Sequence, residues 1–376
     1  MNKTYLALFG AICILLIGNS PSVISPFIVG SFEDYFRLSK QSVGNLMSLE
    51  LGLMALSSIF FSTVKINYKL SRLVTFGVSI VLIAYLLTSF AINTTQLALI
   101  RAFSGIGCGL LIAKGHALIA SNNNPEKSYA FFSLSSTVVG AIIIYVSGSI
   151  LNNFGYQFFF ISLFVFYLML MPLILFIKEK PVNEVINPIR EDLNAKIVLL
   201  LIIGILSFEL VSGGMWAFDE RLGVEFVKIS TSSVALVLSI STLTGLLAPP
   251  IVLYIGNRYG RSLPIYIGVI SILMCFIWML KYPSYFSFFA GNIIWYFFFT
   301  MTVIYVLAAS AIISPTGRLA SWLNASILIG MSVAPSLFGY ILDKGTFIDL
   351  LPLLFGFILI TLVCITFIRK NLDQTE

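Results

Sequence analysis

Four charged residues lie inside long apolar stretches of this sequence: Glu50, Arg101, Lys114 and Glu209. A charged side chain at the centre of a lipid bilayer costs at least about 2.5–3.5 kcal/mol, so such residues pair with one another, bind a ligand or carry protons. At about 1.5 Å of rise per residue, Glu50 lies roughly 12 Å and Arg101 roughly 9 Å along its helix, both measured from the same surface of the membrane. We therefore expect an ion pair between them, either static or broken when a proton or solute arrives.

Three glycines follow Arg101 at alternate positions: Gly105, Gly107 and Gly109. Small residues let neighbouring transmembrane helices approach closely, so this stretch favours tight helix packing. Lys114 points to a different face of the same helix from Arg101. Its amine either contacts a ligand or extends toward the membrane surface.

Glu209 stands apart from the other charges. It lies about thirteen residues, or roughly 20 Å, along a helix expected to begin near Lys196, past the middle of a hydrocarbon core about 30 Å thick. In the apolar spans expected after residue 195, Lys and Arg occur only at the ends, at Lys196, Lys281 and Arg318, so we expect no cation inside these spans to neutralise Glu209. A carboxyl group without a cation in a low-dielectric setting favours its protonated form, so Glu209 is a candidate for proton coupling or for binding an amine. The alternative is a neutral carboxyl bonded to backbone at Gly213-Gly214, where the helix can bend.

Polar and aromatic residues mark two further candidate contact regions. Asn19 lies close to Pro21, where broken backbone hydrogen bonds need partners, so its role is either structural or solute binding. One later apolar run supplies a set of polar and aromatic side chains: Asn292, Trp295, Tyr296 and Tyr305. These side chains either pack in the core or contact a solute.

The elements that carry these residues are transmembrane helices. Of the 376 residues, 59% are hydrophobic and 10% are charged, whereas a soluble protein carries about 25% charged residues. Apolar runs long enough to span a bilayer number twelve. They cover residues 5–30, 42–63, 70–92, 95–120, 128–151, 157–177, 196–217, 232–255, 263–281, 284–312, 317–342 and 347–368. We predict an all-α polytopic membrane protein.

A charged connection divides the chain into two halves of six helices each. The halves are residues 1–177 and 196–376, and the linker is 178–195. Similar residues recur 191 positions apart: Gly148 corresponds to Gly339, and Leu38-Ser39 corresponds to Ile229-Ser230. The offset predicts parallel repeats, a pattern in which two halves rock around a central site. We expect an insertion to break this register between the acidic segments 32–34 and 218–220.

The basic residues predict the orientation. Of the 22 Lys and Arg residues, fourteen fall on the side of both termini, six on the opposite side and two within 95–120. Because cytoplasmic loops carry the excess of Lys and Arg, both termini are expected to be cytoplasmic. The expected location is the plasma membrane, which in a bacterium is the inner membrane.

Three segments resemble motifs of the major facilitator superfamily. The segment from Arg101 to Gly109 is similar to the family's motif B. Asn257-Arg258-Tyr259-Gly260-Arg261 is similar to the core of motif A, with Asn257 in place of Asp, and Gly155-Tyr156-Gln-Phe-Phe-Phe is similar to the segment that opens the sixth helix. Between residues 62 and 72 the acid and the glycine of the other motif A copy are absent. The resemblance implies a fold of twelve transmembrane helices and a loop whose cations hold neighbouring helix ends.

The function we predict is secondary active transport of a small organic solute by alternating access, coupled to protons, by a monomer. Arg101 and Lys114 favour an anionic or zwitterionic metabolite, and import and export both remain open. The alternatives are efflux of drug-like amphipathic compounds, favoured by the aromatic residues, and a membrane sensor or intramembrane transferase that does not transport. The sequence carries no Walker A motif and no metal-ligand cluster. We expect no cofactor, no metal, no enzymatic activity and no nucleic-acid partner.

Overall fold

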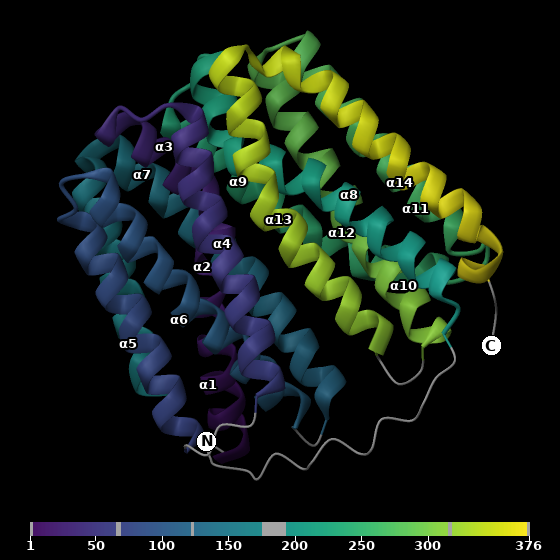
Figure 1. Ribbon diagram of the computed structural model, residues 1–376, viewed down its shortest axis with the longest axis horizontal. Coiled ribbons are helices and arrows are strands. Elements are labelled where there is room, and N and C mark those ends of the chain that lie inside the picture. The colour runs from purple at the N-terminus through teal and green to yellow at the C-terminus, as the bar shows by residue number, and fades with distance from the viewer. Residues whose placement is uncertain (1–2, 65–68, 122–123, 175–192, 315–317, 374–376) are drawn as a thin grey trace.

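The computed structural model describes residues 3–64, 69–121, 124–174, 193–314 and 318–373. These ranges contain helices and no strand (Figure 1). The helices of the first half are α1 (Lys3–Gly18), α2 (Ser20–Val23), α3 (Ser25–Phe36), α4 (Lys40–Thr63), α5 (Leu70–Ser89), α6 (Thr94–Ala120) and α7 (Pro125–Ile174). Those of the second are α8 (Ala195–Arg221), η1 (Leu222–Phe226), α9 (Thr231–Thr244), η2 (Gly245–Leu247), α10 (Ala248–Ile255), α11 (Ser262–Lys281), α12 (Tyr285–Ile313), α13 (Arg318–Lys344), η3 (Phe347–Leu350) and α14 (Leu351–Leu372). Most of the predicted linker lies outside the described residues.

The predicted spans correspond to these helices once the breaks are considered. In the described ranges, 10 helical stretches are long and apolar enough to cross a membrane, and the helix ending at Gly18 is a shorter apolar one. Helix α7 is two helices joined at Gly155, whose φ of 79° and ψ of −170° are not helical. The first span consists of α1, α2 and α3, because Pro21 and Pro26 cannot donate the hydrogen bonds of a continuous helix. The fold is therefore that of an all-α polytopic membrane protein, in agreement with the predicted class.

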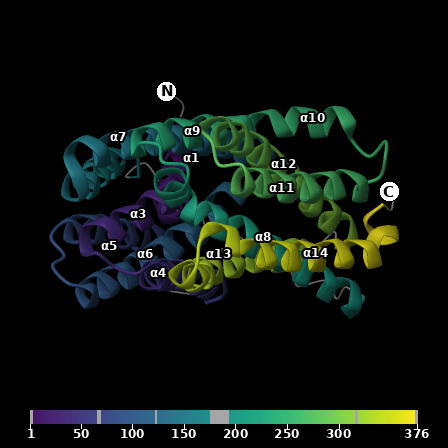
Figure 2. The same cartoon turned by 90° about the horizontal axis from the view of Figure 1, so that it is seen from above.

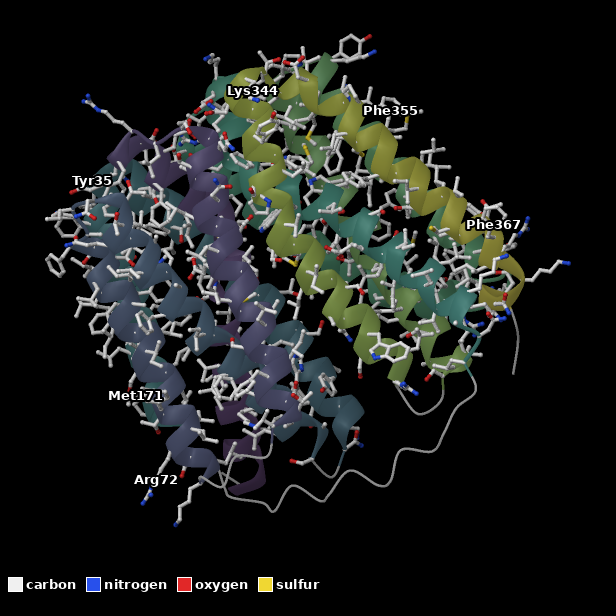
Figure 3. All side chains as sticks on the ribbon, in the orientation of Figure 1. Tyr35, Arg72, Met171, Lys344, Phe355 and Phe367 are labelled. Atoms are coloured by element: carbon white, nitrogen blue, oxygen red, sulfur yellow. The ribbon has the colours of Figure 1, made fainter. Side chains whose placement is uncertain are left out.

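The outer surface is suited to lipid. Large apolar side chains such as Phe355 and Phe367 of α14 project from the bundle, 49% and 69% exposed (Figure 3). Basic side chains stand near opposite ends of the helices, Arg72 at one and Lys344 at the other (Figure 3). Exposed apolar residues between charged ends are the pattern of a bilayer-spanning bundle.

Helices α1–α7 and α8–α14 form two halves that lie side by side (Figure 2). Features of the two halves repeat at the predicted offset of 191 residues. The only non-glycine residues with positive φ in the described ranges are Arg37 (φ 52°) and Lys228 (φ 64°), which are equivalent at this offset. Ser39 and Ser230 are the N-cap residues of the helices that follow, α4 and α9. Their hydroxyls accept hydrogen bonds from the backbone N–H three residues later.

The acidic segments follow the same register, which corrects one expectation. Because Arg37 and Lys228 are equivalent, the equivalent of Asp34 is Glu225 rather than a residue of 218–220. The predicted insertion is therefore wrong. The segment 218–220 instead belongs to the end of α8, which continues to Arg221 rather than stopping at residue 217.

The halves pack against each other on the side opposite the start of α1 and the end of α14; we call this the distal side and the other the termini side. Gly148 of α7 packs on α9, where an added Cβ would lie 3.0 Å from the Thr231 carbonyl. Gly339 of α13 packs in the equivalent way on α4, where an added Cβ would collide with the Lys40 carbonyl. Toward the termini side, α4 and α13 diverge (Figure 1). The two contacts are related by the repeat and close the distal side.

Candidate functional site

A cavity of about 220 Å³ lies between the two halves. Its walls combine hydroxyl groups, small residues, aromatic rings and one carboxyl group. The lining residues are Ser22 and Val23 of α2; Ser136, Thr137, Gly140 and Ile144 of α7; Glu209, Ser212, Gly213 and Trp216 of α8; Thr242 of α9; Trp295, Tyr296 and Phe299 of α12; and Met331 of α13. The structure thus brings Glu209, Trp295 and Tyr296, which the sequence singles out, to one cavity.

Glu209 contributes the carboxyl group of the cavity wall. Its side chain is only 1% exposed, and its Oε1 has no hydrogen-bond partner among the described residues. The Ser212 hydroxyl, one helical turn further along α8, is likewise buried without a partner in the described part of the chain. Gly330 of α13 packs directly on this turn, since an added Cβ would lie 2.6 Å from the Glu209 Cβ. Two residues that line the cavity thus each carry a buried polar atom without a partner in the described part of the chain.

Aromatic side chains form another part of the cavity wall. Ring centroids of Trp216 and Trp295 are 6.2 Å apart, and Tyr296 lies 5.8 Å from Trp216 and 5.6 Å from Trp295. Both indole N–H groups already have acceptors: Trp216 donates to the Ser22 carbonyl at 2.9 Å, and Trp295 donates to Asn292 Oδ1 at 2.8 Å. The indoles therefore contribute apolar ring surface to the cavity wall and no free N–H donor.

Asn292 lies behind the cavity wall and holds the end of α8. Its side-chain amide donates to Asp219 Oδ1 at 3.4 Å and to the Phe288 carbonyl at 3.0 Å, while its backbone carbonyl accepts from Ser241 Oγ at 2.6 Å. Asp219 is buried, and sequence reasoning missed it because the acidic residues after Phe218 suggested a loop. The expectation that no cation lies inside the spans after residue 195 is also wrong, since Arg221 belongs to the buried end of α8.

Glu50 and Arg101 form an ion pair inside the first half, away from the cavity. Arg101 Nη1 lies 3.2 Å from Glu50 Oε1, and Arg101 Nη2 donates to Thr88 Oγ1 at 2.8 Å. The guanidinium also lies 5.3 Å from the Tyr85 ring and 5.6 Å from the Phe160 ring. Both charged side chains are fully buried. The pair joins α4 to α6 and has no access to the cavity in this conformation.

The remaining predicted contact residues bond to backbone. Lys114 Nζ donates to the Phe61 carbonyl at 2.6 Å, tying the termini-side ends of α6 and α4 together. Asn19 Nδ2 donates to the Leu15 carbonyl at 2.8 Å, which satisfies the end of α1. Tyr305 OH donates to the Gly256 carbonyl at 3.1 Å. None of these three residues lines the cavity.

The α6 glycines serve helix packing. An added Cβ at Gly105 or Gly109 would collide with the α4 backbone, and at Gly107 it would lie 2.9 Å from the Ile80 Cγ2 of α5. Helix α6 therefore packs closely on α4 through Gly105 and Gly109 and on α5 through Gly107.

Comparison with known families and structures identifies the fold. Residues 10–335 match the family model of the Major Facilitator Superfamily. The chain belongs to this superfamily. Because the family and its structural relatives are transporters, the chain is a membrane transporter and not an enzyme. The sequence matches no curated protein.

Solved superfamily structures share the fold at low sequence identity. A mutant of the peptide transporter POT superposes with a TM-score of 0.79 at 9% identity, covering 99% of this chain and 96% of that one. A bacterial homologue of the human drug peptide transporters PepT1 and PepT2 gives 0.74 at 12% identity and 98% coverage of each chain. A bacterial homologue of the human lysosomal transporter Spinster, inward-facing and unoccupied, gives 0.69 at 15% identity, covering 100% of this chain and 98% of that one.

In this superfamily chain, the loop that resembles motif A is docked on the end of α14. Gly256 (φ 56°) and Gly260 (φ 74°) provide the left-handed turns around Asn257 and Arg258. Arg261 Nη1 donates to the Leu372 carbonyl at 3.4 Å. The Arg258 guanidinium lies 5.3 Å from the Tyr254 ring.

Asp373 anchors this loop from the other side. Its carboxylate accepts hydrogen bonds from the Ser262 N–H at 2.8 Å and from the Ser262 hydroxyl at 2.7 Å. Partial burial by itself raises the pKa of Asp373, but these hydrogen bonds outweigh it and hold the pKa below its usual value. The contact caps the start of α11.

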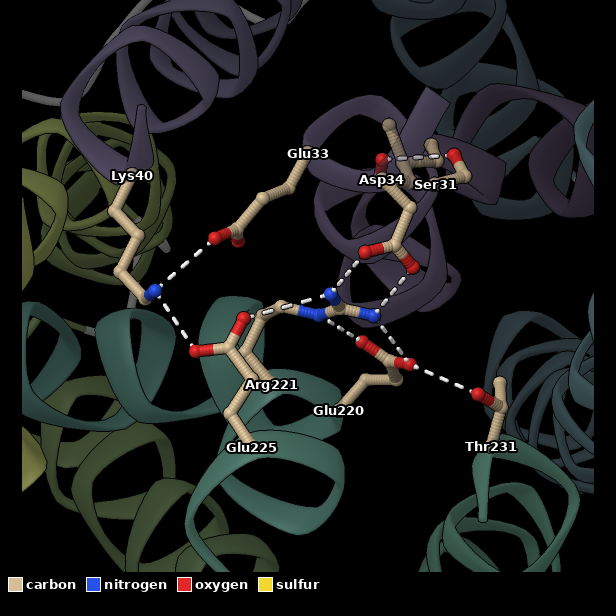
Figure 4. Close-up of polar contacts among 9 residues, drawn as sticks. Ser31, Glu33, Asp34, Lys40, Glu220, Arg221, Glu225 and Thr231 are labelled. Carbon is tan, nitrogen blue, oxygen red and sulfur yellow. Dashed lines mark hydrogen bonds and ion pairs between the residues drawn. The ribbon is translucent and has the colours of Figure 1, made fainter. Parts of the chain in front are cut away.

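A network of charges joins the superfamily halves on the distal side (Figure 4). Arg221 lies 2.7 Å from Asp34, 2.6 Å from Glu220 and 3.5 Å from Glu225. Lys40 lies 3.0 Å from Glu33 and 2.8 Å from Glu225. Glu33, Asp34 and Lys40 come from the first half and the other members from the second, so the network spans the closure. Sequence reasoning noted the acidic segments at corresponding places in the two halves but placed them in separate loops, and it did not predict that Arg221 and Lys40 join them.

Proposed function

We propose that the chain is a secondary active transporter that moves a small organic solute by alternating access and acts as a monomer. One observation carries this proposal: a solute-sized cavity lies between the halves, behind a distal side closed by ion pairs and glycine contacts. A cavity at the interface of parallel repeats is the arrangement in which rocking exposes one site to each side in turn.

The excess of basic residues on the termini side supports cytoplasmic termini and a plasma-membrane location. With that orientation the distal side faces outward. The present arrangement, closed distally, then corresponds to an inward-facing state.

Glu209 is the proposed coupling residue. A buried carboxyl group whose neighbours supply no cation favours its protonated form and releases the proton when water or a positive ligand reaches it. Its place in the cavity wall lets both solute and proton act on the same group. The Glu50–Arg101 pair, enclosed within one half, has no such access and is proposed to hold α4 and α6 together.

The anionic or zwitterionic solute expected from the sequence rests on Arg101 and Lys114. Both cations are engaged elsewhere, so the cavity gives this expectation no support in the present conformation. The aromatic wall favours the alternative, an amphipathic compound. A sensor that binds without transport is the remaining alternative, and a flux assay separates the two.

The test uses proteoliposomes and a solute first identified by its stabilisation of the purified protein against heat. Wild-type protein should accumulate that solute when a pH gradient is imposed and should exchange it across the membrane in the absence of a gradient. Glu209→Gln should abolish proton-driven accumulation and keep exchange. A variant that still concentrates solute with normal dependence on the gradient would show that Glu209 is structural, and binding without any exchange by the wild type would favour a sensor.

A further inference from the structure

We propose that the cavity binds an organic cation with an apolar body, its positive group against Glu209 and its body against the rings of Trp216, Trp295 and Tyr296. This inference rests on the proposed function, because it assigns a chemical class to the solute of the same cavity.

The polar side of the cavity requires a hydrogen-bond donor or a positive charge. Buried side-chain oxygens are almost always hydrogen-bonded, yet Glu209 Oε1 and the Ser212 Oγ lack partners in the described part of the chain. The two residues are three positions apart on α8 and therefore lie on the same face. A carboxylate accepts hydrogen bonds and carries negative charge, so an ammonium group satisfies it in both respects.

The apolar side of the cavity has the geometry that recognises cations through ring faces. Trp216, Trp295 and Tyr296 lie with ring centroids within 6.2 Å of one another. Both indole N–H groups already have acceptors, so a solute meets aromatic ring surface there and no free indole donor. Positive groups are attracted to such faces, most strongly where water is excluded.

The cavity also lacks what an anion requires. None of the described residues that line it is Lys, Arg or His. Arg101 is bound to Glu50, and Lys114 is bound to the Phe61 carbonyl, so neither is directed toward the cavity. An anionic solute would meet the Glu209 carboxylate with no compensating cation, which selects against it.

Proton and cation compete for one carboxyl group. Protonated Glu209 is neutral and loses its attraction for a cation, whereas a bound cation requires the carboxylate and displaces the proton to solution. Tyr296 of α12 is the other titratable group of the cavity wall. Along α8, Asp219 and Arg221 lie about 15 Å or more from Glu209; the charged residues of α13, Arg318, Asp343 and Lys344, stand at its ends.

The remaining neighbours of α8 place their charges far from the cavity. In α14 these are Arg369 and Lys370 in the last turn. In α3 they are Glu33 and Asp34, which belong to the distal network. Cation affinity should therefore rise with pH across the range in which Glu209 loses its proton.

The test measures binding to purified protein in nanodiscs by tryptophan fluorescence. The probes are phenethylammonium and its carboxylate match hydrocinnamate, together with a naphthyl pair of the same design for a larger body. Each cation should bind at least roughly tenfold more tightly than its carboxylate match, since hydrogen bonds to charged groups are among the strong ones. Its affinity should increase with pH.

Glu209→Gln should weaken cation binding roughly tenfold or more and remove its pH dependence. The control is Asp343→Asn, which removes an exposed carboxylate of α13 outside the cavity. It should leave the cation affinity and its pH dependence unchanged. If Glu209→Gln does not fold, the wild-type comparison of cation with carboxylate decides the question. Equal binding of the matched probes, no binding of either cation, or cation binding that survives Glu209→Gln would overturn the inference.

The result also separates this inference from the proposed function. Cation binding without exchange in proteoliposomes would sustain the inference and contradict transport. Exchange of a carboxylate solute, with no cation selectivity, would sustain transport and contradict the inference.

Discussion

At the scale of single residues, the buried charged side chains of the described residues divide into ion-paired groups and two carboxyl groups without a charged partner, Asp219, which bonds to Asn292, and Glu209. Glu50 and Arg101 are paired within one half, and Arg221 is surrounded by carboxylates at the distal closure. Glu209 has an unbonded oxygen at the cavity. The first group can stabilise a conformation, whereas Glu209 is free to respond to a ligand or a proton.

The sequence alone predicts only part of this division of the buried charged residues. The depths of Glu50 and Arg101 follow from helix rise, so their proximity could be anticipated. Asp219 and Arg221 could not, because charged residues after an apolar run normally mark a helix end. Here Arg221 is paired with acids, Glu220 among them, and Asp219 accepts a hydrogen bond from Asn292, so α8 remains helical and buried to Arg221.

Removing Arg101 should destabilise the first half. Arg101→Ala leaves Glu50 buried without its cation, a loss that typically costs about 3–5 kcal/mol. Glu50→Gln in the same chain should restore part of this, because the remaining amide is neutral. Thermal unfolding of both single variants and the double variant measures the coupling. Purely additive losses would mean that the two side chains do not interact in the folded protein.

At the scale of elements, glycines decide how closely helices of the two halves approach. Gly148 and Gly339 occupy equivalent places, one at each repeat-related contact of the distal closure. Their recurrence at a constant offset is visible in the sequence, but which helices they face depends on the packing of distant segments. The kinks at Pro21, Pro26 and Gly155 could likewise be suspected but not located in space.

A larger side chain at Gly339 should weaken the distal closure. Gly339→Val places a side chain against the Lys40 carbonyl, and overpacking of this kind costs typically about 1–3 kcal/mol. The distal side should open more often, so a cysteine placed at Thr231 should react faster with an impermeant thiol reagent. Gly356→Val is the control, because an added Cβ there meets nothing within 4 Å. Unchanged reactivity in Gly339→Val would contradict the proposed role of this contact.

The loop between α10 and α11 should show a defined pH dependence. Since hydrogen bonds from Ser262 hold the pKa of Asp373 below its usual value, the ionised form stabilises the folded state. This stabilisation is present above the usual Asp range and is lost as pH falls through the lowered pKa. Wild type should therefore unfold at higher temperature than Asp373→Asn near neutral pH, and the difference should vanish in acid. A difference that does not change with pH would show that Asp373 acts through packing rather than charge.

At the scale of the whole molecule, two repeats enclose the Glu209 cavity and close on one side. Composition, the spacing of apolar runs and the repeat offset suffice to predict the helical class and its two-fold organisation. The closed distal side could not be predicted, because its contacts depend on how the two halves are placed relative to each other. The distal network favours closure through contacts between acids and cations that lie far apart along the chain.

The central claim is that the halves rock around the cavity, and distances between spin labels test it most directly. One pair at Arg37 and Lys228 reports the distal side, and a second pair at Thr63 and Asn324 reports the termini side. The account predicts two distance populations for each pair in lipid bilayers, with a long distal distance accompanying a short termini-side distance. Changes in pH or added organic cation should shift the two pairs in opposite directions, and Glu209→Gln should remove the response. A single distal distance that stays constant under all of these conditions would contradict alternating access.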